Sequence, residues 1–207
     1  MKIEIENINK SFQNNIIFKN LSCTIDNSSP NAILGANGSG KSTFIKIISG
    51  ILNCDSGIIR YFSSSNTVIH SQDIFKYTAF LAPYVDLIEE FNIAEILNFH
   101  SRFVETLDGL SISNIIDLLD FSKYQNLKVK DYSSGMKQKA KIALCLFYRK
   151  HFLLFDEPCV NLDANAVEWY KEMTSLYLKN RILVVCSNNA DHETFNCTKK
   201  INIEDYK

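Results

Sequence analysis

The sequence of 207 residues lacks long apolar segments. Its most hydrophobic stretches, Ile142–Phe147 and Ile182–Cys186, are far shorter than the run of about 20 apolar residues that a membrane-spanning helix requires. The first ten residues alternate apolar with polar side chains and lack the apolar centre of a signal peptide. We therefore expect a chain that does not cross a membrane by itself.

A strong charge of either sign is also lacking. The formal net charge of -1 offers no whole-protein attraction to nucleic acid, so we expect no nucleic-acid partner. Hydrophobic residues at 46% and charged residues at 22% are ordinary globular usage, which argues against disorder, collagen-like repeats and coiled coil. The length corresponds to about one to one and a half average domains, and we predict a single domain over residues 1–207.

Paired cysteines at metal-ligand or redox spacing are missing as well. The six cysteines are scattered, with no CxxC pair and no Cys/His cluster. Most lie in apolar neighbourhoods, where a thiol behaves as a small buried hydrophobe in a reduced compartment. This pattern predicts a cytoplasmic protein. The cysteines are Cys23, Cys54, Cys145, Cys159, Cys186 and Cys197.

The apolar patterns that are present predict an α/β fold. Alternation over Ile3–Ile8 and the apolar stretch Ile16–Ile25 favour two N-terminal strands. Continuous apolar runs at Phe152–Phe155 and Ile182–Cys186 are typical of parallel strands covered on both faces. Further strands are expected at Ala32–Leu34, Gly57–Phe62 and Tyr77–Leu81. Helices are expected at Lys41–Ser49 and Ala164–Leu178, and another helix follows the small-residue turn near Ser133 and runs to about Tyr148.

Helical spacing from about Asn92 to Arg149, with a turn at Asp108-Gly109, interrupts this pattern. We interpret it as a helical subdomain over about residues 85–149, inserted between residues 1–84 and 150–207. The predicted fold class is α/β with a mixed, mostly parallel core sheet, an N-terminal antiparallel β part and a helical insertion. With the GxxxxGK[ST] match at Gly35–Ser42, it is that of a P-loop NTPase.

A phosphate-binding loop is the most specific signal. Gly35-Ala36-Asn37-Gly38-Ser39-Gly40-Lys41-Ser42 matches GxxxxGK[ST] between a predicted strand and a predicted helix. Glycines let successive N–H groups converge on phosphate oxygens, and the helix dipole adds positive potential. Lys41 supplies a cation for the β- and γ-phosphates, and the Ser42 hydroxyl is a ligand that Mg²⁺ accepts.

Two adjacent carboxylates end the apolar strand Phe152–Phe155. Successive strand side chains point to opposite sides, so Asp156 and Glu157 cannot share one role. We predict that Asp156 holds Mg²⁺, through a water, and that Glu157 polarises the water that attacks the γ-phosphate. A strand end with two solvated acids is the plainer alternative.

A second small-residue turn, Tyr132-Ser133-Ser134-Gly135-Met136, opens the helix that precedes the acidic strand. On its own it is an ordinary helix cap. Its place about twenty residues before the acidic strand favours a second anion site at a helix N-terminus.

The order of these motifs resembles the ATPase subunit of an ATP-binding cassette (ABC) transporter over nearly the whole chain, with Tyr132–Met136 in the place of an LSGGQ-like signature. In that family the signature of one cassette closes over ATP held by another. The resemblance implies a second cassette, identical or different, and a transmembrane permease as partners. It also implies ATP and Mg²⁺ as cofactors, and a cytoplasmic location on the inner face of the cell membrane.

The resemblance also assigns roles by position. Ser133 and Gly135 would touch the γ-phosphate on the partner, Asp163 would be the D-loop carboxylate, and Phe12 would stack on adenine, although an isolated Phe is more often core. Glu157, Lys41 and Asn188 are the expected catalytic residues. The expected nucleotide-binding residues are Phe12, Gly35, Asn37, Gly38, Ser39, Gly40, Lys41, Ser42, Thr43, Ser133, Gly135 and Asp163, and the expected metal ligands are Ser42 and Asp156.

The sequence departs from the family at two functional positions. Pro83 lies near the place of a Gln that ligates the metal, and Asn188 replaces the switch histidine, so that no charge is available there near neutral pH. His192 is expected to be a surface helix residue. These departures predict slow ATP hydrolysis with nucleotide binding retained.

Three functions stay open on the sequence alone: a transporter ATPase, a regulator that binds nucleotide with little hydrolysis, and a soluble ABC ATPase that acts on DNA or ribosomes. The last is disfavoured because long coiled coils, zinc modules and a second cassette are not visible. A GTPase is disfavoured because Asn-Lys-x-Asp does not follow the last strands.

Overall fold

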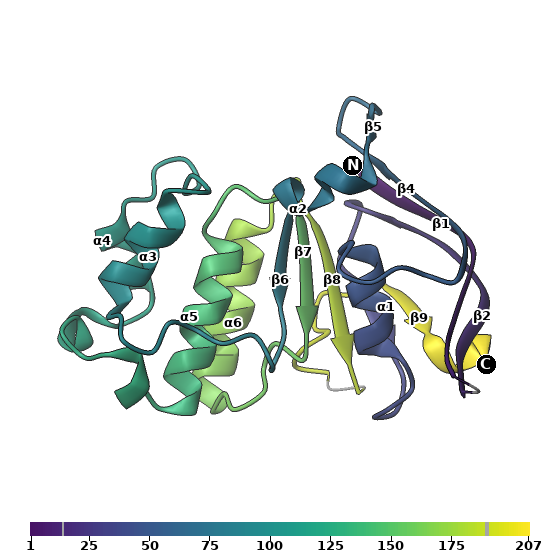
Figure 1. Ribbon diagram of the computed structural model, residues 1–207. Helices are drawn as coiled ribbons and strands as arrows, with labels where there is room; N and C mark the ends of the chain where they lie inside the picture. The colour runs from purple at the N-terminus through teal and green to yellow at the C-terminus, as the bar shows by residue number, and fades with distance from the viewer. Residues whose placement is uncertain (14, 189–190) are drawn as a thin grey trace. The chain divides into compact units, whose positions relative to one another are not determined.

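The structure, a computed structural model, describes residues 1–13, 15–188 and 191–207. It divides into two compact units (Figure 1). Unit 1 comprises Met1–Phe80, His151–Glu157 and Asn180–Lys207, and unit 2 comprises Leu81–Lys150 and Pro158–Lys179. The subdomain boundaries expected from the sequence, at about residues 85 and 149, stay a prediction.

An antiparallel sheet forms one layer of unit 1. Its strand order is β2-β1-β4-β5, formed by β1 (Lys2–Phe12), β2 (Asn15–Asp26), β4 (Ser56–Phe62) and β5 (Val68–Ile69). The buried apolar side chains of β1 change phase between Ile5 and Ile8, where the register shifts and Asn7 has φ 49. This irregularity is typical of a β-bulge, which keeps both flanking isoleucines in the core.

The second sheet has the order β6-β7-β8-β3-β9. Its strands are β3 (Asn31–Leu34), β6 (Thr78–Leu81), β7 (Phe152–Asp156), β8 (Ile182–Ser187) and β9 (Lys199–Asn202). β3 pairs in parallel with both β8 and β9, and β7 pairs in parallel with β8. Every residue of β7 and β8 is buried, as the continuous apolar runs predicted.

Helix α1 (Lys41–Ile48) joins the two sheets of unit 1 through one apolar core (Figure 1). Phe44 of α1 meets Phe18 of β2 edge to face, with ring centroids 6.2 Å apart, and both rings are fully buried. Gly50 ends the helix with φ 78, a left-handed conformation that suits glycine after a helix. The core thereby holds the start of α1 against both sheets.

Unit 2 is helical, and its helices begin with side-chain caps. They are α3 (Ile93–Ser101), α4 (Ile112–Leu118), α5 (Ser134–Leu146) and α6 (Ala164–Tyr177). Asn92 and Ser111 each form a capping box with the residue three positions on. The predicted α/β fold class with an N-terminal antiparallel part and a helical insertion is confirmed.

Several local predictions are corrected. The short helix α2 (Ile74–Tyr77) takes up Tyr77, so β6 begins at Thr78. Helix α5 ends at Leu146, before Tyr148. The strands β5 and β9 were not predicted. β9 contains two lysines, and it forms by pairing with β3, which lies more than a hundred residues earlier in the chain. Among the described residues, no helix is both long and apolar enough to span a membrane.

An ion pair joins the two sheets of unit 1. Lys199 Nζ at the start of β9 donates to Asp26 Oδ2 at the end of β2 over 2.6 Å. This bond, with a second one from the Ser28 hydroxyl, lowers the pKa of Asp26 to about 2. The carboxylate therefore contributes stability above its unfolded pKa of about 3.9, and this contribution is lost as the pH falls toward 2.

We expect Asp26→Asn to lower the free energy of unfolding at pH 7 by up to about 1 kcal/mol, since the pair is partly exposed. Urea denaturation between pH 7 and pH 2 measures the difference from the original chain, which should shrink below pH 4. Lys199→Met should show the same loss. A difference for Asp26→Asn that persists unchanged at pH 2 would contradict this assignment.

Candidate functional site

Strand register in unit 1 brings three loops to one edge of the parallel sheet. Cys186 of β8 is the register partner of both Ile33 in β3 and Asp156 in β7. The phosphate loop follows β3, Glu157 follows β7 and Asn188 follows β8. Because carboxyl ends of parallel strands lie at the same edge, the expected phosphate loop, acidic pair and Asn188 meet there.

The phosphate loop curls around its own lysine. Lys41 Nζ donates to the carbonyl oxygens of Gly35 and Ala36 over 2.9 and 3.1 Å. Gly35 has φ 150, which L side chains rarely adopt, and a Cβ there would lie 2.5 Å from Ser39 Oγ, so any other residue would be strained. Gly38 has φ 78, and a Cβ there would meet nothing within 4 Å. The space over the middle of the loop is therefore open.

The start of α1 presents amide groups to the same place. Its N-cap is Gly40, which supplies no side-chain hydrogen bond, and its first turn, all of it in the described part of the chain, has no acidic residue. The first helical N–H groups and the helix dipole then favour an anion. Ser39, Gly40, Ser42 and Thr43 all lie at this helix start, while Asn37 is exposed in the loop.

Asp156 is the buried carboxylate of the site. It is 2% exposed. Burial raises the pKa of Asp156 above its ordinary value, and the nearby Ser42 hydroxyl and the Lys41 charge partly oppose this rise. The two proposed metal ligands are thus near each other, and both offer the hard oxygen atoms that Mg²⁺ prefers.

Glu157 follows directly and has an unusual backbone conformation. Its φ is 48, in the left-handed region, and its N–H donates to Cys186 O over 3.0 Å. A non-glycine residue in this region is strained by roughly 1–3 kcal/mol, and such strain clusters at functional sites. The half-buried Glu157 and the exposed Asn188 both lie at this edge.

Phe12 is not a core residue. Its side chain is 46% exposed at the end of β1, and Lys10 Nζ lies 5.0 Å from the ring centroid. The β1–β2 hairpin reaches α1 through Ile17, whose Cγ2 would be 2.4 Å from a Cβ on Gly40. Phe12 therefore offers an accessible ring on the hairpin that packs against the phosphate loop.

The C-terminal turn also touches this loop, which the sequence did not indicate. Glu204 Oε1 accepts a hydrogen bond of 3.2 Å from the Ala36 N–H, and Ile203 beside it is fully buried. The two partners are 168 positions apart, so no local signal could have found the contact.

In unit 2, a hollow of about 720 Å³ brings together Ser133, Gly135 and Asp163. Ser133 Oγ accepts from Met136 N over 3.2 Å and caps α5, and Asp163 Oδ1 accepts from Ala166 N over 2.8 Å and caps α6. The plainer helix-cap role is thus present for both residues. Their grouping also forms the surface that a second cassette would need.

Lys139 lines the same hollow and was missed in the sequence. Its ammonium lies 4.6 Å from the Trp169 ring centroid and donates to Leu119 O over 2.8 Å. Burial lowers the pKa of Lys139. Its spacing of four residues from Gly135, one helical turn, is the signal that could have found it.

Both departures from the family pattern, Pro83 and Asn188, are exposed. The carbonyl oxygen of Pro83 accepts from Lys141 Nζ over 3.3 Å. His192 is exposed, as expected, but it lies in a turn, so the prediction that it belongs to a helix is wrong. A run of turn residues from Asp191 replaces the helix, because the chain must reach β9 within a few residues.

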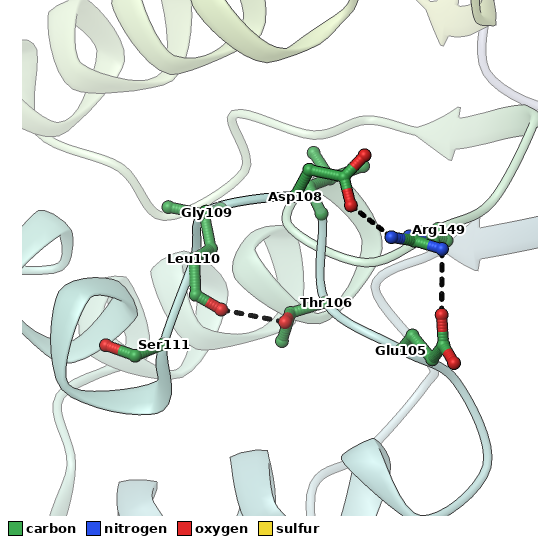
Figure 2. Close-up of a pocket in the computed structure, with 8 residues that line it drawn as sticks. Glu105, Thr106, Asp108, Gly109, Leu110, Ser111 and Arg149 are labelled. Carbon is green, nitrogen blue, oxygen red and sulfur yellow. Dashed lines mark hydrogen bonds and ion pairs between the residues drawn. The ribbon is translucent and has the colours of Figure 1, made fainter.

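A second hollow of unit 2, of about 490 Å³, offers less chemistry (Figure 2). Arg149 binds Glu105 Oε2 over 2.8 Å and also pairs with Asp108. Thr106 Oγ1 donates to Leu110 O over 2.7 Å. Arg149 and the Thr106 hydroxyl are therefore already bonded to groups within residues 105–110.

We expect Asp156→Asn to raise the free energy of unfolding of the ligand-free protein at neutral pH. Burial disfavours the ionised carboxylate in the folded state, and the neutral isostere removes this penalty. The gain should be present above the raised pKa of Asp156 and should vanish as the pH falls below the unfolded value of about 3.9. Chemical denaturation across this range measures it.

The exposed pair of Asp73 with Lys76 provides the control, since Asp73→Asn removes a carboxylate whose pKa is lowered. That variant should lose stability at neutral pH. An Asp156→Asn protein that is also less stable than the original would contradict the assignment.

Comparison with known proteins agrees with this geometry. The profile of a family described as ABC transporter matches residues 18–160. The phosphonates import ATP-binding protein PhnC 1 of Nostoc sp. is 30% identical, over an alignment that covers 89% of this chain and 76% of that protein. The lantibiotic transport ATP-binding protein SrtF of Streptococcus pyogenes is 28% identical, with 90% and 80% covered.

Solved structures show the same fold. A putative ABC transporter ATP-binding protein from Pyrococcus furiosus has a TM-score of 0.81 at 19% identity, with all of both chains covered. A dimeric ATP-binding cassette in a post-hydrolysis state, bound to ADP and Pi, has a TM-score of 0.79 at 19% identity, with 97% and 93% covered. With its phosphate loop and acidic strand within the matched region, the chain belongs to the ABC transporter family.

Proposed function

We propose that this chain is the ATP-binding and ATP-hydrolysing subunit of an ABC transporter, and that it drives a separate membrane-spanning partner. One observation carries the proposal. At one sheet edge of unit 1, the pairing of β3, β8 and β7 brings the phosphate loop, with Ser42, close to Asp156 and Glu157.

The residues present fit a magnesium-bound triphosphate. The amides at the start of α1 and the open space at Gly38 suit the phosphates, and the oxygens of Ser42 and Asp156 suit the metal. Bound Mg²⁺ would neutralise charge on the β- and γ-phosphate oxygens. Phe12 would stack on adenine, since its exposed ring lies on the hairpin that packs on Gly40 through Ile17.

Each functional side chain then has a separate task in hydrolysis. Lys41 exchanges its loop carbonyl partners for the β- and γ-phosphate oxygens and stabilises their negative charge. Glu157 accepts a proton from the attacking water. The water oxygen bonds to the γ-phosphorus while the bond from this phosphorus to the ADP oxygen breaks. Asn188 donates a hydrogen bond to the γ-phosphate.

The proposed working form contains two cassettes. The hollow that gathers Ser133, Gly135 and Asp163 would receive the γ-phosphate of ATP bound by a second cassette. Hydroxyl and amide groups at the N-terminus of α5 suit that charge. In support, one neighbour in fold is a dimeric cassette bound to ADP and Pi.

The permease partner is proposed to contact unit 2 near Tyr84–Phe99. Tyr84, Ile88 and Phe99 are 50%, 41% and 43% exposed, whereas Ile93 is fully buried and belongs to the core. Exposed apolar groups of this kind are typical of interaction surfaces. Binding there would hold the subunit on the cytoplasmic face of the membrane.

A nucleotide-binding regulator with little hydrolysis is the second candidate. It is favoured by the exposed Pro83, whose side chain cannot ligate a metal, and by Asn188, which carries no charge. The same residues make hydrolysis slow in the first proposal.

Replacement of Glu157 by Gln should lower the rate of ATP hydrolysis by about 10²- to 10⁴-fold, the usual contribution of a general base. ATP affinity should be retained, because the amide keeps the shape of the side chain. Phosphate release and ATP binding, measured on the chain alone and with its membrane partner, test this.

The control is Glu4→Gln, which removes a carboxylate that pairs with Lys2 on β1. Its hydrolysis rate should equal that of the original chain. Phosphate release that does not depend on Glu157 would contradict the transporter ATPase, and ATP binding without any hydrolysis would favour the regulator.

The dimer is tested with Ser133→Arg in the Glu157→Gln background. Trapped ATP should convert the Glu157→Gln protein to a dimer, and Ser133→Arg should abolish the dimer, because a long cation fills the place of the γ-phosphate. Light scattering after size exclusion measures the mass. Ser113→Arg, an exposed serine on α4, is the control and should still dimerise. A dimer that tolerates Ser133→Arg would refute this interface.

A further inference from the structure

A single carboxylate, Asp55, holds the end of β1. Its Oδ1 accepts from Lys10 Nζ over 2.7 Å, and its Oδ2 accepts from Ser11 N and Ser11 Oγ over 2.7 and 2.8 Å. Its own N–H donates to Asn9 O over 2.8 Å. The residue thus fastens three successive residues of β1 to the loop that follows α1.

These bonds of Asp55 to β1, which we call the clamp, hold Lys10 beside Phe12. Lys10 and Phe12 are two positions apart in a strand, so their side chains lie on the same face. The Lys10 side chain is 11% exposed, and its ammonium lies 5.0 Å from the Phe12 ring centroid. Because Asp55 holds the ammonium in place, a fixed cation lies beside an otherwise accessible ring.

The clamped segment lies beside the phosphate loop. Phe12 is the register partner of Asn15, two residues before Ile17, a separation of about 7 Å along a strand. Ile17 packs directly on Gly40 at the start of α1. Asp55 itself lies in the loop between α1 and β4.

We propose that Asp55 is a positioning residue for nucleotide recognition, which holds Lys10 and Ser11 so that the Phe12 ring is preorganised to stack on the base. The inference rests on the proposed ATP-binding function. A ring that is already fixed loses little side-chain freedom when the base stacks, which preserves binding free energy. Asp55 contacts Lys10 and Ser11 and lies outside the phosphate loop. Its removal should therefore weaken binding only of ligands that have a base to stack on Phe12.

The test compares ATP with inorganic tripolyphosphate, both with Mg²⁺, by isothermal titration calorimetry on the full chain. Asp55→Ala should weaken ATP about 2- to 10-fold, the range that an aromatic stacking contact supports. Tripolyphosphate has no base, so its affinity should not change. Equal losses for both ligands, or no loss for ATP, would overturn the proposal.

Asp73→Ala is the matched control. Asp73 also binds a lysine over 2.7 Å, its side chain is 43% exposed against 40% for Asp55, and its partner Lys76 lies 5.8 Å from the Phe75 ring. This arrangement repeats carboxylate, ammonium and ring away from the phosphate loop. Its removal should change neither affinity, and a loss of ATP affinity equal to that of Asp55→Ala would overturn the assignment.

A double-mutant cycle with Phe12→Ala separates positioning from general damage. If Asp55 acts through the ring, Asp55→Ala causes no further loss of ATP affinity in the Phe12→Ala chain, whereas additive losses would refute the mechanism. Asp55→Asn, which keeps an acceptor for Ser11, replaces Asp55→Ala if that variant unfolds. If the original chain does not bind ATP, the proposed function itself is rejected. If the original chain binds ATP and Asp55→Ala binds it with the same affinity, only this inference is rejected.

Discussion

The parallel pairing of β3 and β7 with β8 is the constraint on which the candidate site depends. Cys186 faces Ile33 on one side and Asp156 on the other, and this row places the ends of three strands at one edge. The phosphate loop then begins beside the acidic pair, although Leu34 and Asp156 are far apart in the chain. A slip of one residue in the pairing of β7 with β8 would turn Asp156 to the other face of the sheet.

The same edge concentrates features that do not favour stability. Asp156 is a buried carboxylate with a raised pKa, Glu157 has a left-handed backbone, and Ser39 Oγ has no hydrogen-bond partner within the described residues. The large apolar core of unit 1, to which α1 and both sheets contribute, supplies the stability that such a site needs. This combination is characteristic of a site selected for binding a charged ligand.

Contacts between distant segments hold the phosphate loop as much as its own glycines do. Glu204 binds the Ala36 N–H, Ile17 packs on Gly40, and Asp55 fastens the strand that carries Phe12. The loop is therefore enclosed by the C-terminal turn and the β1–β2 hairpin in addition to α1. Its conformation is therefore set by distant parts of unit 1 as well as by its own sequence.

By itself, the sequence determined the fold class, the phosphate loop and the acidic strand end, because glycine spacing and apolar periodicity act within a few residues. It did not reveal β9 or the short α2, whose residues carry no strong local pattern. Tertiary structure alone decided that Phe12 is exposed beside Lys10, that Lys139 joins Ser133 and Asp163, and that Asp55 clamps β1. These relations join residues up to 45 positions apart through side-chain contacts, and such contacts exist only after the strands and helices have packed.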